Sequence, residues 1–282
     1  MTVSTPHPAR IADCLTDGTD NYEADQHLAG LLVKAAPWLP QSVAAHRHCA
    51  QRAVESMARG GISQFLDLGC GLPYSGPGTS RGPRHTYEAA KPFCTPHVAY
   101  VDCARLVTAH ARMMLATRSG TVAVQADVRH VESLLTDRGL TGVIDTRRPV
   151  GVVCRDLLAW LTDQEAAALT TGLHDRLAPG SALFVSHATT ETAPAAMREL
   201  TRLYAGYSIV FRPRPAGQIA QLLGPWTIVR PGLVPSDQWP GQDTARPEPG
   251  QGHAHAALAL HPAPNTPVLA DPGYGPAAPG HP

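Results

Sequence analysis

Three carboxylates follow short apolar runs in the sequence, at a spacing that suits a nucleoside ligand. Asp67 ends the apolar part of FLDLGCGLP and precedes the glycine pair Gly69 and Gly71. Asp102 ends VAYVD, and Asp127 follows TVAVQA. A glycine-rich turn lets the backbone approach a ligand closely, and carboxylates accept hydrogen bonds from ribose hydroxyls and from the adenine amino group. These residues therefore predict a nucleotide-like ligand.

The same glycine pattern disfavours two common nucleotide ligands. In a dinucleotide-binding fingerprint a third glycine would stand at position 74, where this chain has Tyr74. No G-x-x-x-x-G-K-[ST] loop occurs anywhere in the sequence. NAD and ATP are thus both disfavoured, and an NAD-dependent oxidoreductase stays only as an alternative. Taken alone, Gly69-x-Gly71 can also be an ordinary strand-to-helix turn, and a single acidic residue after a strand can be a helix N-cap.

The elements that must position these carboxylates alternate between strands and helices. Five apolar runs predict buried parallel strands: 62–68, 98–102, 121–127, 149–154 and 181–186. Intervening amphipathic patterns predict helices over 103–117, 129–137 and 163–178. This alternation predicts an α/β fold with a doubly wound, Rossmann-like sheet, which binds ligands outside the carboxyl ends of its strands.

Helical and irregular segments flank the predicted sheet. Residues 1–21 show no periodicity and are expected to be irregular, whereas 22–60 predict two helices separated by prolines. Beyond the sheet, two more helices and a strand are expected at 193–207, 215–223 and 226–234. The apolar stretch 253–262 predicts a late antiparallel strand at the sheet edge, and the rest of 240–282 is rich in Pro and Gly and is expected to be coil.

Charge and hydropathy exclude several classes of partner. The 282 residues include 23 basic and 23 acidic ones, for a net charge of +0, so no nucleic acid partner is expected. No apolar run reaches the roughly 18 to 20 residues of a membrane span, and no hydrophobic signal core is present. The six cysteines lack zinc-type spacing, and His253 and His255 are expected to be exposed. We expect a cytoplasmic, metal-free protein, and the sequence leaves a homodimer open.

The pattern D-x-G-x-G resembles motif I of the class I S-adenosylmethionine (SAM) methyltransferases. Two further carboxylates agree with that resemblance. Asp102 stands at the end of the second predicted strand, where it can accept both ribose hydroxyls of adenosine, and Asp127 stands near the end of the third, close to the adenine amino group. Three acids at three successive strand ends are more specific than any one of them.

The span from about residue 9 to 235 resembles a family of SAM-dependent methyltransferases common in actinobacteria, Methyltransf_19, once known as DUF574. Blocks that follow the family's order carry the resemblance: ARIADCLTDGTDN, ISQFLDLGCGLP, VAYVD, ADVR, LAPGS, SHAT and PGLVP. The resemblance implies SAM as cofactor and a small-molecule methyl acceptor as partner. It also implies a helical cap over the cofactor site (1–60) and a SAM-binding domain (61–262). The Pro- and Gly-rich composition of 263–282 predicts a disordered tail.

The resemblance and the strand-end positions together predict which residues surround SAM. In the N-terminal block, Asp20 and Asn21 are expected at the methionine end of SAM, although capping of a helix near Tyr22 explains them equally well. The other expected contacts of SAM are Asp67, Gly69, Cys70, Gly71, Asp102, Asp127, Val128 and Arg155. The loop after motif I, 74–84, carries extra residues whose role the sequence does not give.

The fourth predicted strand departs from the family pattern where chemistry is expected. Many members have L-H-F there, but this chain has CRDLLAW, so Ala159 replaces a histidine. Methyl transfer needs chiefly alignment, and a carboxylate or histidine helps when the acceptor must lose a proton. Asp156 is the first candidate base, with a structural Arg155–Asp156 pair as its alternative. His187 is the second, with a structural histidine as its alternative.

Three aromatic residues are expected to line a substrate pocket: Tyr22, Tyr74 and Trp160. The predicted function is methyl transfer from SAM to an oxygen, a nitrogen or an activated aromatic carbon such as indole C3, in bacterial secondary metabolism. The loss of the family histidine at Ala159 leaves a non-catalytic SAM-binding module as the alternative.

Overall fold

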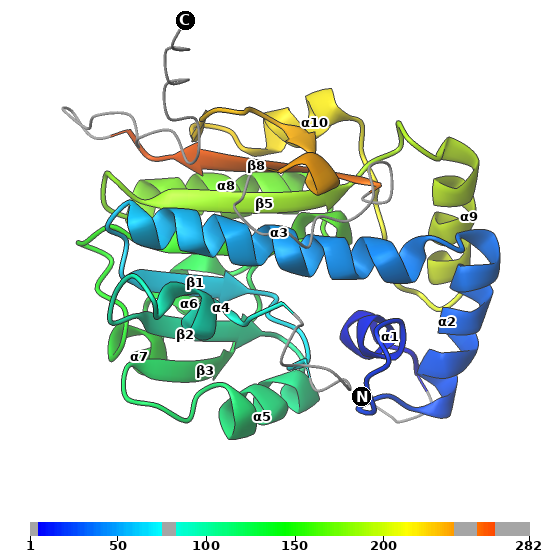
Figure 1. Ribbon diagram of the computed structural model, residues 1–282, viewed down its shortest axis with the longest axis horizontal. Helices are drawn as coiled ribbons and strands as arrows, with labels where there is room; N and C mark the ends of the chain where they lie inside the picture. The colour runs from blue at the N-terminus through cyan, green and yellow to red at the C-terminus, as the bar shows by residue number, and fades with distance from the viewer. Residues whose placement is uncertain (1–4, 75–82, 240–252, 263–282) are drawn as a thin grey trace, which may run out of the picture.

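The computed structural model describes residues 5–74, 83–239 and 253–262. Its mixed sheet has the strand order β3-β2-β1-β4-β5-β8-β6, with β7 also pairing with β8. Strands β1 to β5 run parallel, and β8 runs antiparallel to its neighbours β5, β6 and β7 (Figure 1). The predicted doubly wound and mostly parallel sheet is therefore confirmed.

The first five strands are the apolar runs of the sequence, with ends that differ from the predicted ones by at most two residues. The strand bounds are β1 Gln64–Leu68, β2 His97–Asp102, β3 Thr121–Gln125, β4 Gly151–Arg155, β5 Ala182–Ala188, β6 Thr227–Ile228, β7 Val234–Pro235 and β8 Ala254–Leu260. All residues of β1 and β5 are buried, as in a parallel sheet that helices cover on both faces.

Helices cover the two faces of the sheet. One face carries α3 Leu39–Arg59, α4 Thr86–Ala90 and α5 Arg105–Met114, and the other carries α6 Val131–Leu135, α7 Arg138–Thr141, α8 Asp163–Arg176 and α10 Ala216–Leu222. Along β1, Phe65 packs on the α3 side, whereas Leu66 and Leu68 pack on the α8 side. Because side chains alternate along a strand, Asp67 belongs to the α3 side.

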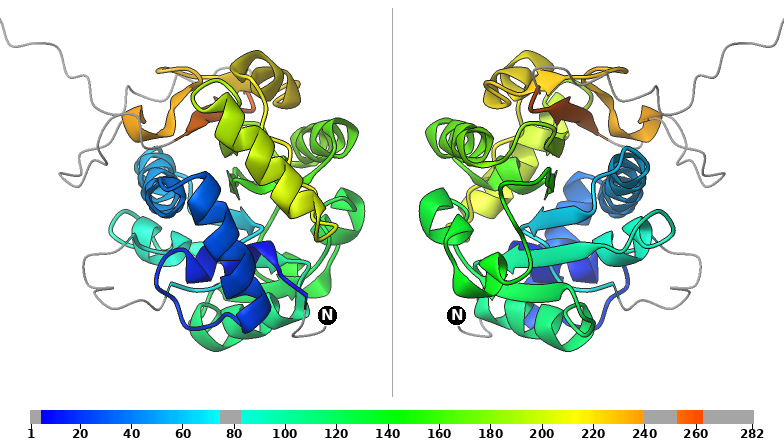
Figure 2. Two further views of the ribbon diagram at one scale, coloured as in Figure 1. Left: turned by 90° about the vertical axis from the view of Figure 1, so that its right-hand side faces the viewer. Right: turned by 90° about the vertical axis from the view of Figure 1, so that its left-hand side faces the viewer.

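A third group of helices lies beyond the carboxyl ends of the strands. It consists of α1 Pro8–Cys14, α2 Glu23–Ala35 and α9 Pro194–Ala205, which share one apolar cluster. Figures 1 and 2 show α2 and α9 side by side at this end of the molecule, with α1 between them and the sheet. Helix α3 runs from this group along the sheet, and the division of the chain at residue 60 stays a prediction.

Local sequence signals explain several helix starts. Thr162 and Glu165 bond reciprocally at the start of α8, where Thr162 N donates to Glu165 Oε2 (2.8 Å) and Glu165 N donates to Thr162 Oγ1 (3.2 Å). Pro8, Pro40 and Pro194 stand in the first turns of α1, α3 and α9, where no N–H partner is needed.

Three sequence expectations are wrong. Residues 8–14 form α1 instead of irregular chain, since a helix of seven residues is too short to show a period. The late strand β8 lies inside the sheet, between β5 and β6, instead of at its edge. The strand expected at 226–234 is broken into β6 and β7 around Pro231, which has no N–H, and Gly232, whose φ is +95°.

Several predictions fall outside the described residues: most of the 74–84 insertion, the coil at 240–252 and the tail at 263–282. Within the described ranges, no helix is both long and apolar enough to cross a membrane.

Candidate SAM and acceptor site

A cavity of about 440 Å³ lies at the carboxyl ends of the strands, under α1 and α9. Its floor includes the loop after β1 and the ends of β2, β3 and β4. Strand order reverses between β1 and β4, and ligands of doubly wound sheets bind at such a switch point. The predicted site residues that line the cavity are Gly69, Gly71, Asp102, Asp127, Val128, Arg155, Asp156 and Trp160.

The two glycines of motif I both have positive φ, +63° at Gly69 and +67° at Gly71. A Cβ at Gly69 would lie 2.8 Å from Leu157 Cδ1, closer than real contacts allow. A Cβ at Gly71 would meet nothing nearer than Arg155 Nη2 at 3.7 Å, so it would project into the space that Arg155 borders. The glycines therefore let the loop turn tightly and keep its backbone open to the cavity.

Asp102 fixes the motif I loop and also faces the cavity. Its Oδ1 accepts from Ala104 N (2.9 Å), and its Oδ2 accepts from Gly71 N (3.3 Å). Burial raises the pKa of Asp102 above its ordinary value, although these backbone N–H groups act in the opposite direction. A carboxylate has about four lone-pair sites, so two bonds leave capacity for ribose hydroxyls. This donor and acceptor set fits the adenosyl part of SAM.

Asp127 and Val128 border the other end of the same floor. Arg129 Nη2 donates to Asp127 Oδ2 (2.6 Å), and these hydrogen bonds lower the pKa of Asp127. Cys103, Ala126 and Val128 add small apolar surfaces beside this carboxylate. A flat base can pack on these surfaces, with its amino group near Asp127.

Two predicted SAM contacts do not line the cavity. Asp67 is buried on the α3 side of the sheet, where Thr86 Oγ1 donates to its Oδ2 (2.7 Å), and burial raises its pKa. The Cys70 side chain is also buried, and its carbonyl accepts from Arg155 Nη2 (2.9 Å). The alternation of side chains along β1 is the reason for the placement of Asp67.

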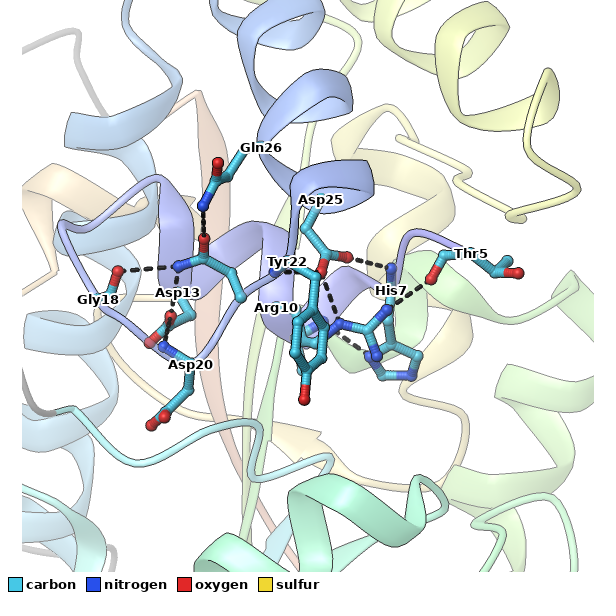
Figure 3. A network of polar contacts seen from close by, with 11 residues as sticks. Thr5, His7, Arg10, Asp13, Gly18, Asp20, Tyr22, Asp25 and Gln26 are labelled. Atoms are coloured by element: carbon cyan, nitrogen blue, oxygen red, sulfur yellow. Dashed lines mark hydrogen bonds and ion pairs between the residues drawn. The ribbon is translucent and has the colours of Figure 1, made fainter. Parts of the chain in front are cut away.

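Asp20 and Asn21 belong to a polar network in the loop between α1 and α2 (Figure 3). Asp13 Oδ2 accepts from Asp20 N (2.9 Å) and from Asn21 Nδ2 (2.9 Å). Asp20 Oδ2 also lies 3.4 Å from His110 Nδ1 on α5. Neither Asp20 nor Asn21 lines the cavity, so the structure gives them a structural role in holding this loop.

A buried ion pair joins α1 to α2 in the same region (Figure 3). Arg10 Nε donates to Asp25 Oδ2 (2.7 Å), and these side chains are 3% and 0% exposed. Asp25 also accepts from His7 N (2.9 Å) and from Tyr22 N (3.0 Å). The Tyr22 ring lies against Arg10 and is not part of the cavity wall, so its assignment to the substrate pocket is wrong.

Two arginines meet at the wall beside motif I. Arg155 donates to the hydroxyl of Tyr74, and the guanidinium of Arg47 lies 4.1 Å from the centre of the Tyr74 ring. Tyr74 stacks on His85 behind them and does not line the cavity, contrary to the prediction. Burial and the charge of Arg155 lower the pKa of Arg47 to about 9, so it stays cationic at neutral pH.

These two guanidiniums both line the cavity. Arg47 donates to Thr16 Oγ1 (2.8 Å), and neither Arg47 nor Arg155 has a carboxylate within ion-pair distance in the part of the chain that the structure describes. Two neighbouring cations without a counter-ion favour an anionic group of a ligand. Sequence reasoning missed Arg47, because nothing in the pattern of α3 distinguishes it from a surface arginine.

His46 is a second residue that the sequence did not indicate. Its Nδ1 contacts Asp156 Oδ2, and its Nε2 lies 3.3 Å from Ser42 Oγ. Burial raises the pKa of Asp156, but His46 and the neighbouring cations outweigh burial and lower it overall. Ser42, His46 and Asp156 all line the cavity.

Aromatic side chains form the end of the cavity under α9. The Trp160 ring centre lies 5.3 Å from that of Tyr204 and 5.0 Å from that of Phe211. Met197, Leu200 and Ile209 complete this apolar wall. The cavity thus joins a polar floor, suited to a nucleoside, to an apolar chamber that suits a flat ring.

The second candidate base, His187, does not reach the cavity. It is 0% exposed, its Nδ1 lies 2.8 Å from Ala188 O, and Arg214 Nη1 donates to its Nε2 (2.7 Å). Burial lowers its pKa to about 4. With both ring nitrogens engaged, His187 is a structural histidine, and its assignment as a base is wrong.

His187 should make the protein sensitive to acid. The unfolded histidine titrates near pH 6.5 and the folded one near 4, so stability is lost as pH falls between these values. In His187→Gln the free energy of unfolding should fall less steeply over this window, by about 1 kcal/mol per pH unit. Urea denaturation at pH 7 and at steps down to pH 4.5 checks this. Equal slopes for the two proteins would contradict it.

The described residues hold no group of three or more His, Cys, Asp or Glu side chains that could bind a metal ion. The six cysteines are free thiols. His253 stacks on Trp38 with ring centres 3.7 Å apart and lines the cavity, while His255 is half-buried in β8.

The model of one protein family, Methyltransf_19, described as S-adenosyl methyltransferase, matches residues 1–262. The chain belongs to this family. Its cofactor is SAM, and the chain is a SAM-dependent methyltransferase. No curated protein sequence matches it.

Two solved structures resemble this methyltransferase along most of its length. A candidate methyltransferase from Thermobifida fusca YX is 32% identical, with a TM-score of 0.84 and coverage of 92% of this chain and 96% of that one. A DUF574 family protein from Streptomyces avermitilis MA-4680 is 29% identical, with a TM-score of 0.83 and coverage of 92% and 99%. The family resemblance seen in the sequence is therefore confirmed.

Proposed function

We propose that this methyltransferase transfers the methyl group of SAM to a small molecule with a flat, largely apolar body. The observation that carries the proposal is one continuous cavity, which joins the ends of β1 to β4 to the aromatic chamber. Bound SAM supplies an electrophilic methyl group on a sulfonium. The chain's own contribution is to align a nucleophile with that group and to exclude water, and alignment accounts for much of the rate in such displacements.

The proposal assigns the floor of the cavity to SAM. Asp102 holds the ribose hydroxyls, Asp127 receives the adenine amino group, and Val128 packs on the base. Gly69 and Gly71 let the backbone pass close to the amino-acid part of SAM. Arg47 and Arg155 bind its carboxylate, because they are two neighbouring cations on this wall without a carboxylate partner among the described residues.

The proposal assigns the apolar chamber to the methyl acceptor. Trp160, Tyr204 and Phe211 offer ring faces and edges, on which aromatic rings pack favourably. An acceptor oxygen, nitrogen or activated ring carbon, such as that of an indole, would then face the polar floor. Two departures from the family pattern support a specialised acceptor, as in bacterial secondary metabolism. Ala159 replaces the family histidine, and Asp156 contacts His46 on the cavity wall.

Calorimetric titration with SAM, followed by assay of S-adenosylhomocysteine (SAH) release against aromatic acceptors, tests this function. We expect binding of SAM and turnover whose KM rises in Trp160→Ala while SAM affinity holds. Binding of SAM without turnover across a broad acceptor panel would favour the non-catalytic module. An unchanged KM for the acceptor in Trp160→Ala would contradict the assignment of the acceptor to the aromatic chamber.

Arg47→Gln should separate the two halves of SAM recognition. Loss of a charge-assisted hydrogen bond costs about 1.5–3 kcal/mol, so SAH should bind roughly 10- to 150-fold more weakly. Methylthioadenosine lacks the amino-acid part and should bind Arg47→Gln as it binds the wild type. Calorimetry with both ligands checks this, with Arg118→Gln as control, because Arg118 pairs with Glu88 outside the cavity. An equal loss for both ligands would contradict the assignment.

A further inference from the structure

Ser42, His46 and Asp156 form a chain of contacts on the cavity wall. His46 lies at its centre, with Nδ1 against Asp156 Oδ2 and Nε2 3.3 Å from Ser42 Oγ. The contact with Asp156 joins α3 to the end of β4 across 110 residues of sequence. All three side chains line the cavity, and none of them is assigned to SAM above.

The Asp156 carboxylate is placed to orient the imidazole. Its Oδ2 contacts His46, while its Oδ1 is buried and has no hydrogen-bond partner in the described part of the chain. The backbone of Asp156 is left-handed, with φ +53°, and its N–H donates to Ser186 O (3.0 Å). Such a conformation costs energy in a residue other than glycine and is typical of functional sites.

A carboxylate that contacts Nδ1 favours one tautomer of the imidazole. Asp156 accepts the Nδ1 proton, so neutral His46 presents the lone pair of Nε2 toward Ser42. The Ser42 hydroxyl can then donate to Nε2 and accept a proton from a ligand at the same time. Ser42 and His46 are 3% and 5% exposed, so bulk water does not compete for the hydrogen bond between them.

The aromatic chamber begins next to this chain of contacts. The 3-10 turn Leu157–Trp160 starts directly after Asp156, and Trp160 packs with Tyr204 and Phe211 in the chamber. Ser42, His46 and Trp160 line the same cavity. This chain of contacts and the aromatic chamber therefore serve one acceptor.

We propose that Ser42 and His46 remove a proton from the acceptor, with Asp156 as the positioning residue, and that the acceptor is an aromatic compound bearing a hydroxyl or N–H group. The inference rests on the proposed function. Ser42 Oγ takes the acceptor's proton and passes its own to His46 Nε2. On an oxygen acceptor the lone pair freed by proton removal bonds to the methyl carbon, whereas a nitrogen acceptor uses its own lone pair and gives up its proton once the new bond forms. In both cases the S–CH3 bond breaks with its electron pair left on sulfur. The methylated acceptor and SAH leave, and the imidazolium returns its proton to water.

The state of His46 can be measured without an acceptor, by nitrogen NMR of the histidine-labelled full chain saturated with SAH. We expect the Nδ1–H tautomer at neutral pH. In Asp156→Asn the pKa of His46 should fall by about 1–3 units, because a neighbouring negative charge is lost. The signal of His27, exposed on α2, should not move. An Nε2–H tautomer, or an unchanged pKa of His46 in Asp156→Asn, would overturn the inference.

Kinetics with matched naphthalene probes measures proton removal itself. We expect SAH release with 1-naphthol and 1-naphthylamine, and not with the corresponding methyl thioether or dimethylamine. General base catalysis is worth about 10²–10⁴-fold, so His46→Gln should lower kcat about 100-fold or more while SAH affinity stays unchanged. Added imidazole should restore part of the activity of His46→Ala. The double variant His46→Gln/Asp156→Asn should be no slower than His46→Gln, because the pair acts as a unit.

The outcomes separate this inference from the proposed function. Methylation of the thioether and the tertiary amine alone, or wild-type kcat in His46→Gln, would overturn the inference and leave methyl transfer to a small molecule intact. SAH binding without release from any probe would overturn both.

Discussion

Asp102→Ala is expected to weaken SAM binding by about 1–3 kcal/mol, roughly 5- to 150-fold. The carboxylate lies on the cavity floor, and its remaining lone pairs are the acceptors available to ribose hydroxyls. Its loss also frees Gly71 N, which Asp102 holds at 3.3 Å. Calorimetry with SAM and with methylthioadenosine should show the loss for both ligands, unlike Arg47→Gln.

Asp145→Ala is the matched control for this experiment. Asp145 pairs with Arg147 on the surface and does not line the cavity, so its replacement should leave SAM affinity unchanged. Thermal unfolding establishes that both variants are folded. Wild-type affinity in a folded Asp102→Ala protein would count against the whole placement of SAM.

Asp25→Asn is expected to lower the free energy of unfolding by about 3–5 kcal/mol, because it leaves the buried Arg10 without a counter-ion. Asp25 is 0% exposed and accepts from Arg10, His7 and Tyr22 at 2.7, 2.9 and 3.0 Å. Since α1 lines the cavity through Pro8, Ala9 and Ala12, SAM should also bind more weakly. Urea denaturation and hydrogen exchange of the α1 amides measure the two effects.

An exposed ion pair provides the comparison for Asp25. Glu199 and Arg202 pair on α9 with 42% and 69% of their side chains exposed, and Glu199→Gln should cost less than about 0.5 kcal/mol. The double variant Arg10→Met/Asp25→Leu should regain stability relative to Asp25→Asn, because the unpaired charge is removed. A loss in Asp25→Asn as small as that in Glu199→Gln would contradict the expected role of the pair.

The sheet and the polar floor of the cavity could be predicted because they depend on local signals. Apolar runs of five to seven residues marked the strands, and strand ends in a parallel sheet meet at one edge, which brings Asp102 and Asp127 to the same cavity. Asp67 failed as a prediction of the same kind. The side to which a strand residue points depends on the register of the whole strand, and only the packed sheet fixes it.

The other half of the cavity depends on contacts between distant segments. His46 meets Asp156 across 110 residues, and the period of α3 gives no sign of which histidine faces a cavity. Helix α1 was missed because seven residues are too few for a period. Conversely, His187 follows a strand as a catalytic residue would, and only its contacts with Ala188 and Arg214 show that it is structural.

The position of β8 bears on how this chain is completed during synthesis. Strand β5 ends at residue 188, and its neighbour β8 begins at residue 254, so one edge of β5 stays unpaired until some seventy further residues have left the ribosome. An open apolar edge of this kind attracts strands of other chains. Nascent chains stalled before residue 254 should therefore depend on chaperones, whereas chains released after residue 260 can close their own sheet.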